Sequence, residues 1–314
     1  MSKKFKFPPE LDFIRAGHLS QKVSTESMDG KICVITGTTS GVGYQAAIRL
    51  AKAGAKIVMI VRNKEKAEKL CTEIRSFSTN EPDYFLADFS DLNELRKAVE
   101  AILVKYPRID VLVNNAGVHM TTRQLTVDGF ETAFAVNHLA SFLVTSLLLK
   151  RMVESAPSRI IQVNSEGHRF NGLKIDDLNW EKRKYGGYGG YGASKTAQLM
   201  TVWELNELLQ GKGVTINAMH PGAVKSNIGT NNGKLYNWFS RYLIQPTLKN
   251  PEISGEAIYY LASSPEMEGV TGKFFNLTNE EIPAPHARNR ELGKQIFQLS
   301  KEFIHLDKEN VYEV

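Results

Sequence analysis

Short runs of apolar and β-branched residues alternate with longer segments of helical period from residue 31 onward. The runs are nearly continuous in apolar character, which is typical of strands covered on both faces. Seven runs are predicted to be strands: KICVIT (31–36), KIVMIV (56–61), YFLAD (84–88), DVLVNNAG (110–117), RIIQVNS (159–165), VTINAMHPG (214–222) and KFFNL (273–277). Helices are predicted at residues 43–54, 64–74 and 94–106, at Phe130–Arg151, and from about Tyr191 to Leu209.

This alternation predicts a parallel sheet wound with right-handed crossovers. We therefore expect one α/β domain over residues 29–314, built on a doubly wound parallel sheet of about seven strands of the Rossmann type. Residues 1–28 contain two adjacent prolines and little periodicity, and we expect an N-terminal arm there. Two stretches, at about 166–190 and 226–250, fit neither strand nor helix. Both follow strand carboxyl ends, where open α/β sheets bind ligands, so we expect substrate loops.

Composition narrows the functional classes. The net charge of +5 over 314 residues comes without a long Lys/Arg block or zinc-finger spacing, so nucleic acid is not an expected partner. The two cysteines, Cys33 and Cys71, exclude a disulfide framework, and the histidines lack ligand spacing, so no metal is expected. The N-terminal residues lack an apolar stretch, and the longest apolar run, around Leu139–Leu149, is short and interrupted by polar residues. We expect no membrane span and a cytoplasmic location.

A glycine-rich turn, TGTTSGVG (residues 36–43), lies between the first predicted strand and the first helix. Glycines permit a tight turn and let a pyrophosphate approach the backbone, while amides at the following helix N-terminus face an anion. The spacing is G-x-x-x-G-x-G rather than G-x-G-x-x-G. Its position favours nucleotide binding over the alternative of a merely tight connection. The candidate cofactor contacts in this turn are Gly37, Thr39, Ser40, Gly41, Val42 and Gly43.

Residues at the end of the second strand favour NADP. NAD-specific sites usually have a carboxylate there for the ribose 2′-hydroxyl, whereas this chain has Val61 followed by Arg62 and Asn63. A guanidinium can bind a 2′-phosphate through two hydrogen bonds, and a carboxylate would repel it. NAD is therefore the less favoured cofactor; the alternative is that Arg62 is only a solvated charge at the helix entry. Asp88, followed by Phe89, is a candidate for the adenine amino group or for an ordinary cap.

Tyr191 and Lys195 are four residues apart in a predicted helix, so their side chains share one face. A phenol has a reference pKa near 10, and a nearby ammonium lowers it. A shift of ~3 pKa units requires ~4 kcal/mol of preferential stabilisation of the phenolate. The pair suits general acid–base catalysis, although this spacing is also common on helices without any function.

Five motifs in this order resemble the short-chain dehydrogenase/reductase family: TGTTSGVG, NNAG (114–117), Ser165 after the fifth strand, YGASK (191–195) and HPG (220–222). The resemblance covers about residues 29–280. Several strings are similar to the retinol dehydrogenase-like branch: VRNKEKAE, VNHLA, VNSEGH, DDLNWE, PGAVKSNI and ARNRELGKQIFQLSKEF. Many members of that branch carry an apolar N-terminal anchor. This chain differs from them, because its N-terminal arm is polar.

The resemblance implies a role for each residue of the site. Tyr191 exchanges the proton of the substrate hydroxyl, and Lys195 lowers the pKa of Tyr191 and holds the nicotinamide ribose. Ser165 hydrogen-bonds the substrate oxygen, and Asn137 anchors a water that connects Lys195 to solvent. Two structural alternatives stay open: Ser165 simply ends a strand, and Asn137 bonds only to backbone. Further implied cofactor contacts are Asn115, Ala116 and Gly117 beside the adenosine half, and Pro221, Gly222, Val224 and Ser226 beside the nicotinamide.

These motifs predict an enzyme that transfers a hydride between NADP(H) and a carbonyl or alcohol group of an apolar small molecule. A retinoid-, steroid- or lipid-like aldehyde or ketone fits this expectation. One alternative is reduction of a carbon–carbon double bond on the same scaffold, as in protochlorophyllide reductase-like relatives. Another is a non-catalytic NADP(H)-binding sensor, against which the intact Ser165–Tyr191–Lys195 set argues. The resemblance also implies a homo-oligomer that pairs through helix faces.

Overall fold

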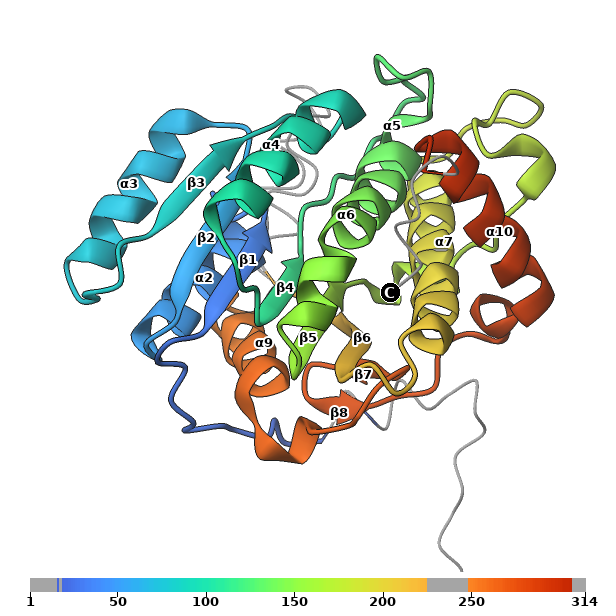
Figure 1. Cartoon of the computed structure of the whole chain (residues 1–314). Helices are drawn as coiled ribbons and strands as arrows, with labels where there is room; N and C mark the ends of the chain where they lie inside the picture. The colour runs from blue at the N-terminus through green and yellow to red at the C-terminus, as the bar shows by residue number, and fades with distance from the viewer. Residues whose placement is uncertain (1–15, 17–18, 225–247, 307–314) are drawn as a thin grey trace, which may run out of the picture.

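The computed structural model describes residue 16 and residues 19–224 and 248–306. One eight-stranded sheet runs through these residues in the order β3-β2-β1-β4-β5-β6-β7-β8 (Figure 1). The strands β1 to β7 pair in parallel, and they lie within or overlap the seven predicted runs, which confirms the doubly wound sheet. The strands are β1 (Ile32–Thr36), β2 (Lys56–Val61), β3 (Asp83–Leu86), β4 (Val111–Asn114), β5 (Ser158–Val163), β6 (Val214–His220), β7 (Phe274–Asn276) and β8 (Asn279–Glu280).

The eighth strand is an addition to the seven that the pattern predicts. β8 pairs antiparallel with β7. Leu277, between them, has a φ of 56°, and this left-handed residue lets the chain reverse directly after β7. A two-residue strand is too short to leave an alternating pattern in the sequence, so it was not predicted.

Helices cover both faces of the sheet (Figure 1). Alternate residues of β1 show the two layers, since Val34 packs into one apolar cluster and Cys33 and Ile35 pack into the other. The cluster around Cys33 includes α2 (Gly41–Lys52), α3 (Lys64–Arg75) and α9 (Glu252–Ser263). The cluster around Val34 includes α4 (Leu92–Lys105), α6 (Ala140–Glu154), α7 (Gly187–Leu208) and α10 (Arg290–Phe303). Neither α9 nor α10 was predicted from the sequence pattern.

Two predicted helices differ from the structure at their boundaries. The helix expected at Phe130–Arg151 begins as α5 (Thr132–Phe134), passes through a π turn, η2 (Ala135–Leu139), and continues as α6. The helix expected to open at Tyr191 begins one turn earlier, at Gly187. Tyr191 therefore lies inside α7, where its backbone is already helical.

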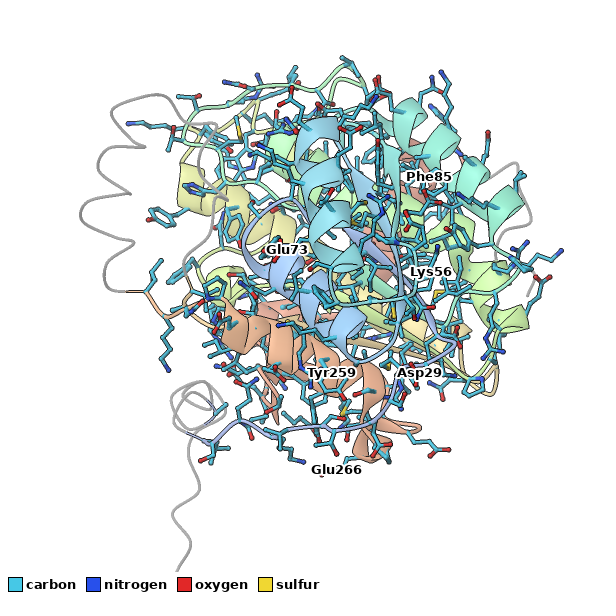
Figure 2. The ribbon with its side chains drawn as sticks, turned by 90° about the vertical axis from the view of Figure 1, so that its left-hand side faces the viewer. Asp29, Lys56, Glu73, Phe85, Tyr259 and Glu266 are labelled. Atoms are coloured by element: carbon cyan, nitrogen blue, oxygen red, sulfur yellow. The ribbon has the colours of Figure 1, made fainter. Side chains whose placement is uncertain are left out.

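The described part of the predicted N-terminal arm, residues 19–28, lies along α9 and the turn after β7 (Figure 2). The Tyr259 hydroxyl donates to the Glu26 carbonyl at 2.6 Å, and the Lys22 amide donates to Thr278 Oγ1 at 2.7 Å. These contacts anchor the arm on the face of the sheet opposite α7. Most of the second predicted substrate loop, 226–250, lies outside the described residues.

One segment, Thr132–Glu154, is long and apolar enough by composition to cross a membrane. In the fold, 89 % of its most apolar window is buried inside the protein. Its apolar side chains pack against α4 and the sheet, so its composition is accounted for by the core.

Candidate active site

A cleft of about 950 Å³ opens at the carboxyl ends of β1, β2, β4, β5 and β6. This edge is where open α/β sheets bind ligands. The cleft brings together most of the predicted site residues: Gly37, Thr39, Ser40, Gly41, Val42, Arg62, Asn63, Asp88, Phe89, Asn115, Ala116, Gly117, Ser165, Tyr191, Lys195, Pro221, Gly222 and Val224. Gly43 and Asn137 lie behind this lining, and Ser226 lies outside the described residues.

The glycine-rich turn after β1 forms a cradle at one end of the cleft. Gly37 and Gly41 have φ values of 69° and 60°, a region that glycine adopts readily. A Cβ atom at Gly43 would lie 2.3 Å from Asn115 Nδ2, so only glycine lets α2 approach the β4 loop this closely. Ser40, at the start of α2, makes no side-chain cap bond to any described residue. The first amides of α2 are therefore left for a ligand in the cleft.

The loop after β4 forms the adjoining wall. Thr36 Oγ1 accepts hydrogen bonds from the amides of Asn115 and Ala116, both at 2.9 Å. Asn115 Nδ2 donates to the carbonyls of Thr36 and Gly37, both at 3.0 Å. Asn114 instead points into the core and donates to Thr145 of α6 and Gln162 of β5, so its role is structural. The NNAG motif thus locks the glycine turn to β4.

Two cations line the cleft beyond the end of β2. Arg62 is accompanied by Lys66, in the first turn of α3, which the sequence analysis did not name. Asn63 caps α3 by accepting from the Lys66 amide at 2.8 Å. Asp88 accepts from the amide and the hydroxyl of Ser90, at 2.8 and 2.7 Å, so its local turn-forming role is present in the structure.

Tyr191, Lys195 and Ser165 line the same cleft. Lys195 Nζ lies 6.0 Å from the centre of the Tyr191 ring, one helical turn away on α7. It donates to the Val163 carbonyl at 2.9 Å. The Ser165 hydroxyl accepts from the Gly167 amide at 3.0 Å and also hydrogen-bonds Tyr191. The prediction that the Tyr191 and Lys195 side chains share one face of the helix is thus confirmed.

Burial opposes charge on both members of this pair. It raises the pKa of Tyr191 above its ordinary value, while the hydrogen bond with Ser165 lowers it in part. It lowers the pKa of Lys195 to about 7. A buried site of this kind makes any added positive charge effective in stabilising a phenolate, because the local dielectric is low.

Asn137 lies in the π turn η2 and is fully buried. Its Oδ1 accepts from the Val118 amide at 2.7 Å, and its Nδ2 donates to the Val118 carbonyl and to Ser194 Oγ. The side chain therefore ties the loop after β4 to α7. These contacts go beyond the backbone-only alternative, because Ser194 is a side-chain partner adjacent to Lys195.

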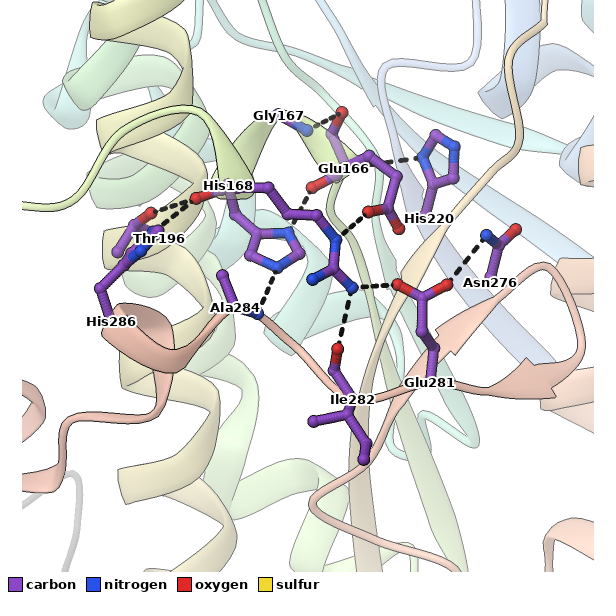
Figure 3. Close-up of polar contacts among 12 residues, drawn as sticks. Glu166, Gly167, His168, Thr196, His220, Asn276, Glu281, Ile282, Ala284 and His286 are labelled. Carbon is purple, nitrogen blue, oxygen red and sulfur yellow. Dashed lines mark hydrogen bonds and ion pairs between the residues drawn. The ribbon is translucent and has the colours of Figure 1, made fainter. Parts of the chain in front are cut away.

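The segment that follows Ser165 is held by a polar network (Figure 3). η3 (Glu166–Arg169) begins directly after Ser165. His168 Nε2 accepts from the Ala284 amide at 3.1 Å, which places the ring proton on Nδ1, where it can donate to the Ser165 carbonyl at 2.7 Å. Burial lowers the pKa of His168 to about 3, so the ring is neutral. One imidazole thus joins the Ser165 backbone to the C-terminal segment.

Arg169 makes a second link across the same interface (Figure 3). Its guanidinium pairs with Glu166 and with the fully buried Glu281, next to β8. Burial and the neighbouring Glu281 carboxylate raise the pKa of Glu166 to about 7. The Glu166 amide also donates to Nδ1 of His220 at 3.4 Å, a weak contact that links this segment to the end of β6.

The remaining lining forms a more apolar end beside Tyr191. Tyr188 comes from the first predicted substrate loop, and Leu248 from the second. Both positions fall within predicted substrate loops but were not named individually, because only the folded chain shows which residues of a long loop face the cleft. The lining residues that the sequence analysis did not name also include Val118, Met120, Gln124, Thr132 and Val136. Among the residues that the structure describes, no group of three His, Cys, Asp or Glu side chains could hold a metal ion.

Comparison with known proteins agrees with this site. Residues 31–236 match the family model described as short chain dehydrogenase. The chain is 36 % identical over 307 residues to human Retinol dehydrogenase 13, which covers 96 % of this chain and 92 % of that protein. It is also 36 % identical over 281 residues to mouse Retinol dehydrogenase 12, which covers 89 % of this chain and 88 % of that protein.

Solved structures show the same fold. A protein from Mycobacterium paratuberculosis has a TM-score of 0.72 at 27 % identity and covers 89 % of this chain and 95 % of its own. A short-chain dehydrogenase from Shigella flexneri, solved in complex with NADP, has a TM-score of 0.65 at 21 % identity and covers 81 % of this chain and 99 % of its own. Sequence match and site geometry lead to one conclusion: this chain belongs to the short-chain dehydrogenase/reductase family, in its retinol dehydrogenase-like branch.

Proposed function

We propose that this protein is an NADP(H)-dependent reductase that converts an apolar aldehyde or ketone to the alcohol, and catalyses the reverse reaction when the oxidised cofactor is supplied. The observation that carries the proposal is that Ser165, Tyr191 and Lys195 line the same cleft as the glycine turn. A nucleotide cradle and an acid–base set within one cleft are the parts that hydride transfer needs.

The cradle fits a dinucleotide. The positive φ of Gly37 and Gly41 and the close approach at Gly43 leave room for a pyrophosphate against the backbone. Arg62 and Lys66 at the far end favour a 2′-phosphate, which a carboxylate in their place would repel. A fold neighbour that binds NADP is consistent with this choice. When bound, the reduced nicotinamide supplies the hydride.

The chain itself supplies the proton and positions the carbonyl. The Tyr191 phenol donates its proton to the substrate oxygen, and the Ser165 hydroxyl holds that oxygen by a hydrogen bond. The Lys195 ammonium stabilises the phenolate that remains and holds the nicotinamide ribose. Proton transfer from a positioned side chain contributes a factor of about 10²–10⁴ in rate.

The substrate is proposed to be an apolar small molecule of retinoid, steroid or lipid type. Support comes from the apolar and aromatic side chains in the lining of the cleft, which include Met120, Val136, Tyr188 and Leu248. The relatives named retinol dehydrogenases are consistent with such a substrate. An apolar pocket with few polar groups selects by size and shape more than by hydrogen bonding.

Cofactor choice is tested by titrating NADPH and NADH into the wild type and Arg62→Ala, following the fluorescence of the nucleotide. We expect the wild type to prefer NADPH, and Arg62→Ala to lose about 1.5–3 kcal/mol of NADPH affinity, roughly 10- to 150-fold, with NADH affinity unchanged. Lys69→Ala is the matched control, because Lys69 is an exposed cation of α3 outside the cleft lining. Equal affinity for both nucleotides, unaltered in Arg62→Ala, would refute the 2′-phosphate assignment.

A further inference from the structure

Gln198 is a buried polar residue that the proposed chemistry does not yet use. It lies three residues after Lys195 on α7, and its side chain is 1 % exposed. Burying an amide is unfavourable unless its hydrogen bonds are made inside the protein. The partners of this amide therefore indicate why it is there.

Both ends of the Gln198 amide are engaged. Its Oε1 accepts from Lys195 Nζ at 3.3 Å and from Asn164 Nδ2 at 2.7 Å. Its Nε2 donates to the Asn137 carbonyl at 2.6 Å and makes a longer contact with Ser141 Oγ at 3.4 Å. The amide thus spans the distance between the Lys195 ammonium and the backbone of the π turn.

We propose that Gln198 is a positioning residue of this active site, whose amide connects the Lys195 ammonium to the Asn137 carbonyl and fixes the ammonium beside Tyr191. This inference rests on the proposed function of Lys195. The resemblance to the family places a water between Asn137 and Lys195. In this chain a side-chain amide already bridges the same two residues.

The geometry of Lys195 shows what the bridge achieves. An ammonium has three N–H donors. Val163 and Gln198 accept two of them, on the side of Lys195 that faces the sheet and the π turn. The third is then free to serve the cofactor ribose in the cleft. A lysine with a flexible four-carbon stem would otherwise sample several positions.

The amide oxygen also favours the charged form of Lys195. Burial alone lowers the pKa of this lysine, and the groups that contact Nζ from β5 and α7 are neutral. Tyr191 is the titratable neighbour, on the same helix. A hydrogen-bond acceptor aimed at the ammonium opposes the effect of burial, so it keeps the positive charge present at a higher pH.

The test measures the affinity for NADPH against pH in the wild type, Gln198→Met and Gln198→Glu. We expect the affinity for NADPH to fall as Lys195 loses its proton with rising pH. Gln198→Met removes the acceptor and should move that fall to lower pH by about one unit, whereas the carboxylate of Gln198→Glu should move it to higher pH. In carbonyl reduction, Gln198→Met should lower kcat/KM about 10-fold at neutral pH.

Gln162→Met is the matched control, because Gln162 is a similarly buried glutamine of β5 whose amide oxygen accepts from Asn114, outside the cleft. It should lose stability while keeping the pH profile of the wild type. A profile unchanged in both Gln198 variants would overturn the positioning role. If Gln198→Met does not fold, Gln198→Glu alone tests the positioning role: the fall in NADPH affinity should move to higher pH, and an unchanged profile would overturn the role.

The two proposals fail in different ways. A wild type that binds NADPH in a pH-dependent manner but reduces no carbonyl would contradict the proposed function, and the titrations would still decide the role of Gln198. A wild type that reduces carbonyls with an unshifted profile in both Gln198 variants would contradict only the inference about Gln198. Failure to bind either nucleotide would overturn both.

Discussion

Arg169 places one positive charge among two carboxylates that are largely withdrawn from water. Its side chain is 13 % exposed, and its partners Glu166 and Glu281 are 21 % and 0 % exposed. Removing one partner of a buried ion pair lowers stability more than replacing both partners with apolar residues, because the remaining charge is buried without a counter-charge. Glu166 directly follows Ser165, so the ion pair between Arg169 and Glu166 helps to hold the backbone of Ser165 in place.

Arg169→Met should therefore lower the free energy of unfolding by about 3–5 kcal/mol, measured by urea denaturation. Arg75→Met is the control, because Arg75 and Glu81 form a similar pair that is exposed to solvent, and it should leave stability near that of the wild type. If both variants lost the same amount, the buried network would have no special part in holding the Ser165 segment.

Some residues of the site were predictable because their relation is local. Tyr191 and Lys195 are one helical turn apart, and the glycine turn joins a strand to the next helix, so sequence spacing fixes their geometry. Arg169 and Glu281 are 112 residues apart, and their pairing depends on the path of the chain after β7. Such long-range contacts leave no spacing pattern in the sequence.

At the scale of elements, α7 shows why a boundary was misplaced. Glycine has low helix propensity, so the Gly-rich stretch before Tyr191 was expected to be a loop. In the fold, a Cβ at Gly189 would lie 2.8 Å from the Trp180 ring, and one at Gly190 would lie 2.6 Å from the Tyr185 hydroxyl. These glycines allow close packing of the first turn of α7 under aromatic side chains, and tertiary contacts override their propensity.

The π turn η2 is a second element that spacing could not show. It widens the helix between α5 and α6 at Ala135–Leu139, in the place where Asn137 contacts Val118 and Ser194. π turns occur often at functional sites. An apolar period of 3.6 residues predicts the helix, but it cannot distinguish a single π turn from the α-helical turns around it.

Over the described residues, histidines couple stability to pH, because burial lowers the pKa of His119, His138, His168 and His220. Burial lowers the pKa of His138 and of His168 to about 3, and that of His220 to about 4, from an ordinary value of 6.5. Between these values the unfolded chain binds more protons than the folded one, so stability falls as pH drops below about 6.5. Glu166, with its pKa raised to about 7, acts in the opposite sense between about 4.5 and 7. Burial also raises the pKa of Glu131 and of Glu204, which act in the same sense as Glu166, so four histidines act against three carboxyl groups.

The free energy of unfolding should therefore be lower at about pH 5 than at about pH 7.5, measured by urea denaturation. His138→Gln tests whether this pH dependence comes from the histidines, because a glutamine can keep the hydrogen bond to Ser300 Oγ but does not titrate. Its pH dependence should be shallower than that of the wild type. Equal stability at the two pH values would show that the histidines do not take up protons on unfolding.

The parallel sheet, the covering of both its faces and the position of the cleft could be predicted because they follow from the alternation of strands and helices along the chain. The helices α9 and α10, which lie on opposite faces of the sheet, were not predicted, because after residue 209 only the strand runs stood out in the sequence. The apolar end of the cleft is a product of this tertiary arrangement, so the sequence alone points to a class of substrate and not to its shape.

The most direct test of the account is to incubate the wild type with NADPH and an apolar aldehyde such as a retinal, and to follow nucleotide oxidation and product together. We expect one alcohol formed for each NADPH oxidised, with a rate about 10²–10⁴-fold lower in Tyr191→Phe, which still binds the nucleotide. Tyr84→Phe, which alters a surface tyrosine bonded to Glu68, should behave as the wild type. Saturation of a carbon–carbon bond with the carbonyl intact, or tight NADPH binding without oxidation, would contradict the proposed carbonyl reduction.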